Sequence, residues 1–259
     1  MATTQHYVWA GGHFTLLVSA LRYILAWALF KTPSSLWYKA SFVGAFVSYT
    51  IVCQKSLGSP QPTAAWAKRA IADENVQYLI LALFWLTSKP VALALFPYTI
   101  FSLFHALTFT RTTLMPQILP SGPPATAGGA PTPHPLSKKL QVWVRTNYDS
   151  AMKVVAYAEI FILARVIVGA LLFRNSFLTP IFYAHFIRMR FFQSAFTREA
   201  IVRVTAKIDQ YVDRPETPPA VKQGWRTVQG LIGRWTGTTL NAPAPAGQAP
   251  PAAAGNGTR

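Results

Sequence analysis

The most constraining feature of this sequence is an almost uncharged stretch in its first half. From Asn75 to Thr110 the chain carries one formal charge, Lys89, and Pro90 follows it directly. A membrane-spanning helix needs about 20 apolar residues, and a proline interrupts a helix. The stretch therefore predicts a hairpin of two apolar arms, 76–86 and 91–109. The first arm crosses only if residues 70–71 extend it; otherwise it dips in and returns, with Lys89 reaching back to the headgroups.

The composition supports a membrane protein over the alternative, a large soluble helical protein. Hydrophobic residues make up 51% of the chain and charged residues only 12%. A soluble core cannot hide this much apolar surface between so few charges. We therefore expect an all-α, polytopic integral membrane protein built from helical hairpins, with cytoplasmic amphipathic helices and disordered Pro/Ala/Gly-rich segments. Cys53 is the single cysteine, so no internal disulfide can form.

Turn residues and charge changes divide the chain into successive segments. Thr63 is expected to cap a short interfacial helix between the first two hairpins. We expect a cytoplasmic N-terminus at 1–12, a first membrane hairpin at 13–53, a linker with the interfacial helix at 54–75, a second hairpin at 76–110, a flexible Pro/Gly-rich loop at 111–137, a third hairpin at 138–187, a basic amphipathic helix at 188–214, a C-terminal amphipathic helix at 215–237, and a disordered tail at 238–259.

The basic residues predict both the orientation and the partner. The net charge is +16, from 24 Lys and Arg against 8 acidic residues. In a three-hairpin arrangement, the segments on the side of the N-terminus hold most of the basic residues, and the opposite turns hold few. The positive-inside rule then puts both termini in the cytoplasm. A basic face beside a membrane favours anionic lipids. Nucleic acid, the competing partner, is not expected, because no nucleic-acid-binding motif is present.

The C-terminal amphipathic helix is the most specific feature outside the membrane segments. Its apolar residues recur every three or four positions, as on one face of a helix, and its basic residues lie between them. We expect this face to attach reversibly to a membrane surface. The alternatives are ordinary packing onto the membrane domain and recognition by a nuclear import receptor. The apolar positions are Val221, Trp225, Val228, Leu231, Ile232 and Trp235, and the basic positions are Lys222, Arg226 and Arg234.

Three ionisable residues, Arg22, Glu159 and Arg165, lie within apolar segments. A charge at the centre of a spanning helix costs about 2.5 to 3.5 kcal/mol on insertion scales. We therefore expect these residues to face protein, with Glu159 paired to Arg22 or Arg165. A transporter or channel would instead use them to line a substrate path.

No enzymatic activity, cofactor or metal is expected. The five histidines show no metal-ligand spacing, and no nucleophile elbow, phosphate loop or carboxylate pair is present. His105, among phenylalanines, is interpreted as a packed or interfacial histidine.

Several separated motifs resemble the transmembrane protein 33 family over residues 13 to about 213. They are HFTLLVSALRY, QKSLGSPQ, DENVQYL, LFWL, SKP and SLFHALTFTR. The residues of this sequence that fall on the family motif include Asp73, Glu74, Asn75, Lys89, Pro90, His105 and Arg111.

The resemblance implies a polytopic protein of the endoplasmic reticulum membrane and the nuclear envelope, without known enzymatic activity, that works with reticulon-type shaping proteins. Fungal members associate with nuclear pore complexes and nucleoporins, and carry a C-terminal amphipathic helix that contacts membrane and an import receptor. Residues 220–237 occupy the matching place, so the sequence looks fungal.

The expected function is support of membrane curvature, tubule organisation and nuclear pore assembly or distribution through helix insertion. The alternatives are an anchor or adaptor for import receptors or reticulon-type proteins without shaping activity and, third, a transporter or channel.

Overall fold

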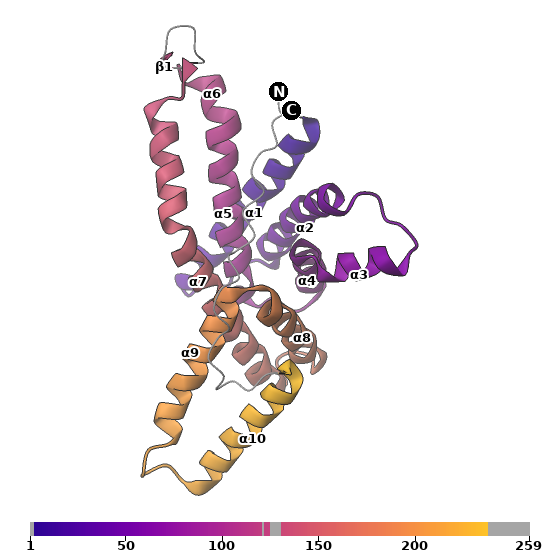
Figure 1. Ribbon diagram of the computed structural model, residues 1–259, viewed down its shortest axis with the longest axis vertical. Coiled ribbons are helices and arrows are strands. Elements are labelled where there is room, and N and C mark those ends of the chain that lie inside the picture. The colour runs from indigo at the N-terminus through magenta and orange to yellow at the C-terminus, as the bar shows by residue number, and fades with distance from the viewer. Residues whose placement is uncertain (1–2, 121, 125–130, 238–259) are drawn as a thin grey trace. The chain divides into compact units, whose positions relative to one another are not determined.

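The computed structural model describes residues 3–120, 122–124 and 131–237, most of which are helical. The expected disordered tail, 238–259, and part of the expected flexible loop lie outside these residues. The chain forms two units: unit 1 extends to Phe186, and unit 2 begins at Ile187, within the eighth helix (Figure 1).

A tightly packed helix pair begins unit 1. Helix α1 (Thr4–Ala28) and helix α2 (Ser35–Leu57) are each capped at the N-terminus by a hydroxyl side chain. Helix α1 starts ahead of residue 13, where the hairpin was expected, because Thr3 supplies a cap and Gly12 does not end the helix. A Cβ atom on Gly12 would lie only 2.7 Å from the carbonyl oxygen of Gly44. The two backbones are therefore in direct contact, as in helix pairs built on small residues.

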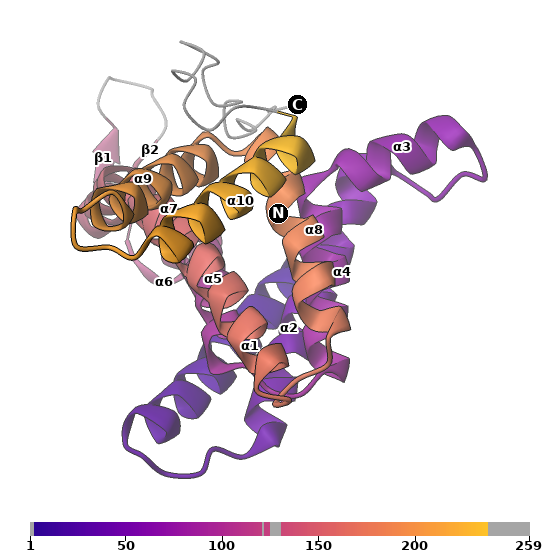
Figure 2. The same ribbon diagram turned by 90° about the horizontal axis from the view of Figure 1, so that it is seen from below.

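Helix α3 (Ala64–Ala72) and helix α4 (Glu74–Thr87) meet at a corner formed by Asp73. The prediction that Thr63 caps the interfacial helix is confirmed, since its hydroxyl accepts a hydrogen bond from the amide of Trp66 at 3.2 Å. Helix α3 extends outward from the other helices of unit 1 in both views (Figures 1 and 2). Helix α4, at 14 residues, is about 21 Å long, shorter than the ~30 Å hydrocarbon core.

The helical segment after the Lys89-Pro90 break is longer than expected. It comprises η1 (Ala92–Ala94), α5 (Leu95–Phe109), the π-helical turn η2 (Thr110–Leu114) and α6 (Met115–Ile118). Residues 111–118, expected to be flexible, are therefore helical. Pro116 has no N–H to donate within this segment, and the π-helical turn η2 lies directly before it, where the regular α-helical hydrogen-bonding pattern is already interrupted. Strands β1 (Gly122–Pro124) and β2 (Pro131–Thr132) then pair antiparallel.

Helix α7 (Pro135–Leu171) and helix α8 (Leu178–Gln193) follow in the chain. Helix α7 has 37 residues and is about 55 Å long, so it is much longer than a bilayer core requires. Its apolar residues gather in its second half, 154–171. Within unit 1, α8 runs antiparallel to α4: Phe182 stacks on Phe84 at 4.4 Å, and Phe186 contacts Tyr78 at 5.2 Å between ring centroids.

Aromatic side chains form the core of unit 1. Tyr38, Phe42, Trp85 and Tyr98 are almost completely buried, and Phe42 meets the Tyr98 ring edge-on at 5.2 Å. The Tyr98 hydroxyl donates to the carbonyl oxygen of Tyr78 at 2.8 Å. A tyrosine can therefore be buried here, because its polar end has a backbone partner.

Unit 2 contains the hairpin of helix α9 (Ala195–Val212) and helix α10 (Pro219–Thr236), seen at the yellow end of the chain in Figure 1. Pro219 is the first residue of α10, where proline favours a helix start. Gly237 ends the helix in the left-handed conformation, with φ of 68°, which glycine adopts without a steric penalty.

The prediction of an all-α, polytopic membrane protein is confirmed. In the part of the chain that the structure describes, four helical segments are long and apolar enough to cross a membrane: Thr4–Ala28, Ser35–Leu57, Ala92–Ile118 and Pro135–Leu171. Helices α4 and α8 are shorter and pair with each other.

Candidate membrane interface

Helix α10 presents an apolar arc and a basic edge along its length. We call Val221, Trp225, Val228, Leu231, Ile232 and Trp235 the apolar arc, and Lys222, Arg226 and Arg234 the basic edge. Four members of the arc are exposed within the described structure, whereas Trp225 and Ile232 are half-buried. The arc is therefore only partly covered.

Asp209 of α9 holds the covered side of α10. Its Oδ1 atom accepts hydrogen bonds from the Trp225 indole N–H at 2.5 Å and from the Gln229 amide at 2.8 Å. Trp225 and Gln229 are four residues apart and thus lie on the same face of the helix. The indole can pack against α9 because its one donor has a charged acceptor. Packing against α9 thus covers one side of the arc, while the other side remains open.

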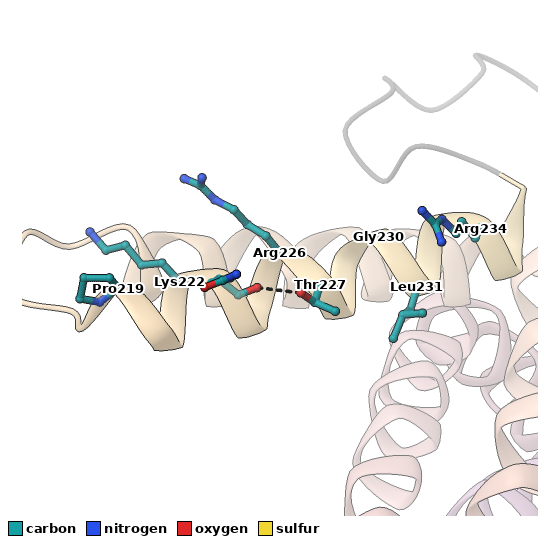
Figure 3. Close-up of a pocket in the computed structure, with 8 residues that line it drawn as sticks. Pro219, Lys222, Arg226, Thr227, Gly230, Leu231 and Arg234 are labelled. Atoms are coloured by element: carbon teal, nitrogen blue, oxygen red, sulfur yellow. Dashed lines mark hydrogen bonds between the residues drawn. The ribbon is translucent and has the colours of Figure 1, made fainter.

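The basic edge borders a shallow groove along α10. The groove has a volume of about 620 Å³ and is lined by the basic edge together with Pro219, Gln223, Thr227, Gly230 and Leu231. Figure 3 shows Lys222 and Arg226 extending from one side of the helix and Leu231 from the other. The Thr227 hydroxyl donates to the Gln223 carbonyl at 3.0 Å, so its polar atom is used within the helix.

This arrangement suits an interface between water and lipid. An interfacial helix lies in the membrane plane with its apolar face down and its basic residues level with the headgroups. Lysine and arginine also reach anionic phosphates from such a position, because their long stems pack along apolar surface. The geometry of α10 is therefore compatible with an anionic surface, of a membrane or of a protein, beside the basic edge.

The three intramembrane ionisable residues do not form the expected cluster. Glu159 is fully buried in unit 1 and accepts a hydrogen bond from the Tyr78 hydroxyl. Arg22 and Arg165 are exposed, and neither has an ion pair among the described residues. Six residues separate Glu159 and Arg165, which puts them about 120° apart around α7. The structure thus brings neither arginine to Glu159.

Three family-motif residues, Asp73, Glu74 and Asn75, lie at the start of α4. The Asp73 carboxylate caps α4 by accepting from the amides of Asn75 at 2.8 Å and Val76 at 3.2 Å. Its second oxygen accepts from the Ser56 hydroxyl at 3.3 Å, which ties the corner to α2. Glu74 lies in the first turn of α4, where a negative charge complements the helix dipole. Lys89 and Pro90 separate α4 from η1, and Arg111 lies in η2.

His105 belongs to an aromatic and polar cluster between α1 and α5. Its ring stacks on that of His13 at 4.6 Å, and Trp9 meets both rings edge-on. The His13 Nδ1 atom lies 2.9 Å from the Ser102 hydroxyl. The His105 ring thus packs against other aromatic rings, while much of the residue is exposed in the described structure. Among the described residues, no group of three His, Cys, Asp or Glu side chains is placed to hold a metal.

Sequence reasoning missed Asp209, Tyr78 and Gly44. Asp209 is one of three acidic residues in the otherwise basic segment 188–214, with Glu199 and Asp213, and no local signal marks it as the acceptor for the indole of Trp225. Tyr78 and Gly44 make their contacts with residues far away in the chain, so no local pattern reveals them.

Comparison with known proteins agrees with the fold. The family model described as Transmembrane protein 33/Nucleoporin POM33 matches residues 1–238. "Nucleoporin POM33" of Chaetomium thermophilum is 36% identical over 88% of this chain and 85% of its own length. "Tetra-spanning protein 1" of Schizosaccharomyces pombe is 35% identical over 88% and 83%. "Pore membrane protein of 33 kDa" of Saccharomyces cerevisiae is 26% identical over 88% and 82%. No solved structure matches. The chain belongs to the Transmembrane protein 33/Nucleoporin POM33 family.

Proposed function

We propose that this protein resides in the endoplasmic reticulum membrane and nuclear envelope and supports curved membrane at nuclear pores, as a structural component without catalysis. Both termini face the cytoplasm in this proposal. The relatives named "Nucleoporin POM33" and "Pore membrane protein of 33 kDa" support the location. The half-covered apolar arc of α10 supports the mechanism, and it is the observation on which the proposal depends.

The exposed arc provides enough free energy for reversible attachment. Val221, Val228, Leu231 and Trp235 are 51%, 43%, 59% and 39% exposed. Burying a large apolar side chain completely contributes roughly 1.5 to 3 kcal/mol, so inserting about half of each contributes about 1 kcal/mol per residue and about 4 kcal/mol together. Three basic residues near an anionic surface add about 1 kcal/mol each. Because α10 is already held against α9, little ordering free energy is lost on binding.

Insertion from one side favours curvature. Helix α10 would occupy area in the cytoplasmic leaflet alone, and α4 and α8 are too short to extend fully across a standard core. When one leaflet gains area, the membrane is least strained if it curves so that this leaflet lies on the convex side. Pore membranes and tubules are bent in this way, so the protein would concentrate there.

Proteoliposomes of two sizes test the mechanism with the full chain. We expect the protein to be enriched in vesicles of small diameter over large ones when the lipid mixture is anionic. The Leu231→Asp variant should lose the enrichment, because it places a charge in the arc. The matched control, Gln223→Asp, introduces the same aspartate side chain on the polar side of the same helix. Equal distribution of the native chain between the two sizes would refute curvature preference.

An adaptor role is the competing function, with the basic edge contacting an import receptor, a nucleoporin or a reticulon-type protein. Replacing residues 219–236 by an unrelated lipid anchor separates the two. In fungal cells depleted of the native protein, an adaptor that needs only anchoring keeps its localisation at the nuclear rim and its effect on pore distribution. A protein that shapes membrane through α10 loses the effect on pore distribution while remaining in the membrane.

A further inference from the structure

An apolar groove runs along the membrane-spanning half of α7, beside η1 and α5. It has a volume of about 640 Å³ and is lined by Leu93, Phe96, Val154, Tyr157, Ala158, Phe161, Ala164, Arg165 and Val168. From Val154 to Val168 it extends along α7 by about 21 Å, roughly two-thirds of the ~30 Å hydrocarbon thickness. It therefore has the length and the lining of a site for a hydrocarbon chain.

Arg165 gives this groove a charged end. Its side chain is exposed, and it makes no ion pair within the described ranges. A Cβ atom on Gly169 would lie 2.6 Å from the Arg165 Nη1 atom, so the guanidinium extends along α7 toward the helix end at Leu171. The guanidinium therefore lies about one helical turn nearer to Leu171 than the Cα atom of Arg165 does. This is the direction in which an arginine reaches the headgroup level.

Gly169 makes this position of the guanidinium possible. The same Cβ atom would lie 1.9 Å from the Asn175 Oδ1 atom, so both side chains occupy the space that a larger residue would fill. The Asn175 amide nitrogen donates to the Val166 carbonyl at 3.1 Å, which fixes Asn175 against the end of α7. The guanidinium is therefore held over the last turn of the helix, beside the open end of the groove.

We propose that the groove binds one phospholipid with an anionic headgroup. The headgroup phosphate pairs with the Arg165 guanidinium, and one acyl chain lies along the groove between Phe96 and Phe161. A guanidinium and a phosphate form charge-assisted, bidentate hydrogen bonds, and this pairing offsets the cost of an arginine in an apolar segment. The site is separate from α10 and does not depend on the function proposed for that helix.

The contrast between Arg165 and Arg22 supports a built site. Both are exposed arginines in spanning helices, and both lie six residues before the last residue of their helix. Arg22 is not among the residues that line the groove. If either arginine served only to extend to the membrane surface, the two would behave alike toward lipid. If the acyl-chain groove is part of the site, only Arg165, which lines the groove, should retain a lipid.

Native mass spectrometry of the full chain in detergent, with added phosphatidylserine or phosphatidylcholine, tests the proposal. We expect one retained phosphatidylserine per chain and less phosphatidylcholine, because both lipids carry the phosphate but the choline cation beside it repels the guanidinium. Arg165→Gln should raise the Kd for phosphatidylserine by about tenfold or more, as expected for the loss of a charge-assisted hydrogen bond. Arg22→Gln, the matched control, should leave it unchanged. Equal loss in both variants, or equal retention of the two lipids, would overturn the proposal.

Filling the groove provides a second, independent variant. Ala164 is exposed and lines the groove, so Ala164→Trp adds bulk without entering the core. It should displace phosphatidylserine, whereas Val18→Trp, at an exposed position of α1, should not. The elution volume on size exclusion reports whether each variant stays folded. If the native chain elutes as a dimer and Ala164→Trp makes it monomeric without changing lipid retention, a second copy occupies the groove and the lipid site is refuted.

Discussion

The contact between α1 and α2 makes a sharp prediction at two adjacent glycines. A Cβ atom on Gly12 would lie 2.2 Å from the Ser48 hydroxyl oxygen and 2.7 Å from the Gly44 carbonyl oxygen, whereas nothing lies within 4 Å of a Cβ atom on Gly11. Ser48 can rotate, but it then loses its hydrogen bond to the Trp9 carbonyl at 2.9 Å. The Gly44 carbonyl belongs to the backbone of α2, so the helices must separate.

The expected magnitude follows from these contacts. Overpacking a tight interface costs about 1 to 3 kcal/mol, and losing the Ser48 hydrogen bond adds about 1 kcal/mol. The gain in helix propensity from Gly to Ala, about 1 kcal/mol, applies to Gly11→Ala and Gly12→Ala alike and cancels in the comparison. The two variants should thus differ by about 2 to 4 kcal/mol in the free energy of unfolding.

Thermal unfolding of the purified full chain in detergent, followed by intrinsic tryptophan fluorescence, measures this difference. Gly12→Ala should lower Tm by several degrees, and Gly11→Ala should leave it unchanged or raise it. Gly44→Ala should behave like Gly12→Ala, because its Cβ atom would lie 2.5 Å from the Gly12 carbonyl oxygen. If the two adjacent alanine variants melted at the same temperature, the direct contact between the helix backbones would be refuted.

Two buried hydrogen bonds give further predictions. Tyr78→Phe removes the donor to buried Glu159 and should destabilise the chain by about 1.5 to 3 kcal/mol, whereas Tyr157→Phe should have little effect; equal Tm values for the two variants would contradict this. Asp209→Ala removes the acceptor that holds α10, so hydrogen exchange in α10 should accelerate by tenfold or more. Asp213→Ala, outside that contact, serves as the control, and unchanged exchange in Asp209→Ala would show that another contact holds α10.

The sequence predicts the parts of this fold that depend on neighbouring residues. The Lys89-Pro90 break, the Thr63 cap and the amphipathic pattern of residues 219–236 are local signals, and each corresponds to a feature of the structure. Caps, prolines and helical periodicity act within a few residues, and their physical effect does not depend on the rest of the chain.

The remaining features depend on contacts between distant segments. Gly12 was expected to lie before the first hairpin, but it is inside α1 and allows α1 and α2 to touch. Glu159 was expected beside an arginine, yet its described partner is Tyr78, which is 81 residues away. The direction of Arg165 depends on the empty space at Gly169. None of these follows from periodicity, because each requires knowing which helices are neighbours.

The same difference applies to α10. The alternation of apolar and basic residues identifies the helix but does not say how much of its apolar arc is covered. Asp209 decides this, since it holds Trp225 and leaves the other side of the arc open. Membrane attachment and packing against α9 are therefore compatible properties of one helix.

The depth of α10 in the membrane tests the central claim most directly. Cys53, the single native cysteine, is replaced by alanine in the full chain, and an environment-sensitive fluorophore is attached at Val228→Cys in the arc or at Gln223→Cys on the polar side. In anionic proteoliposomes we predict a blue-shifted emission at position 228, quenched by lipids brominated on their acyl chains, and a water-like emission at position 223. Water-like emission at both positions would contradict insertion of the apolar arc.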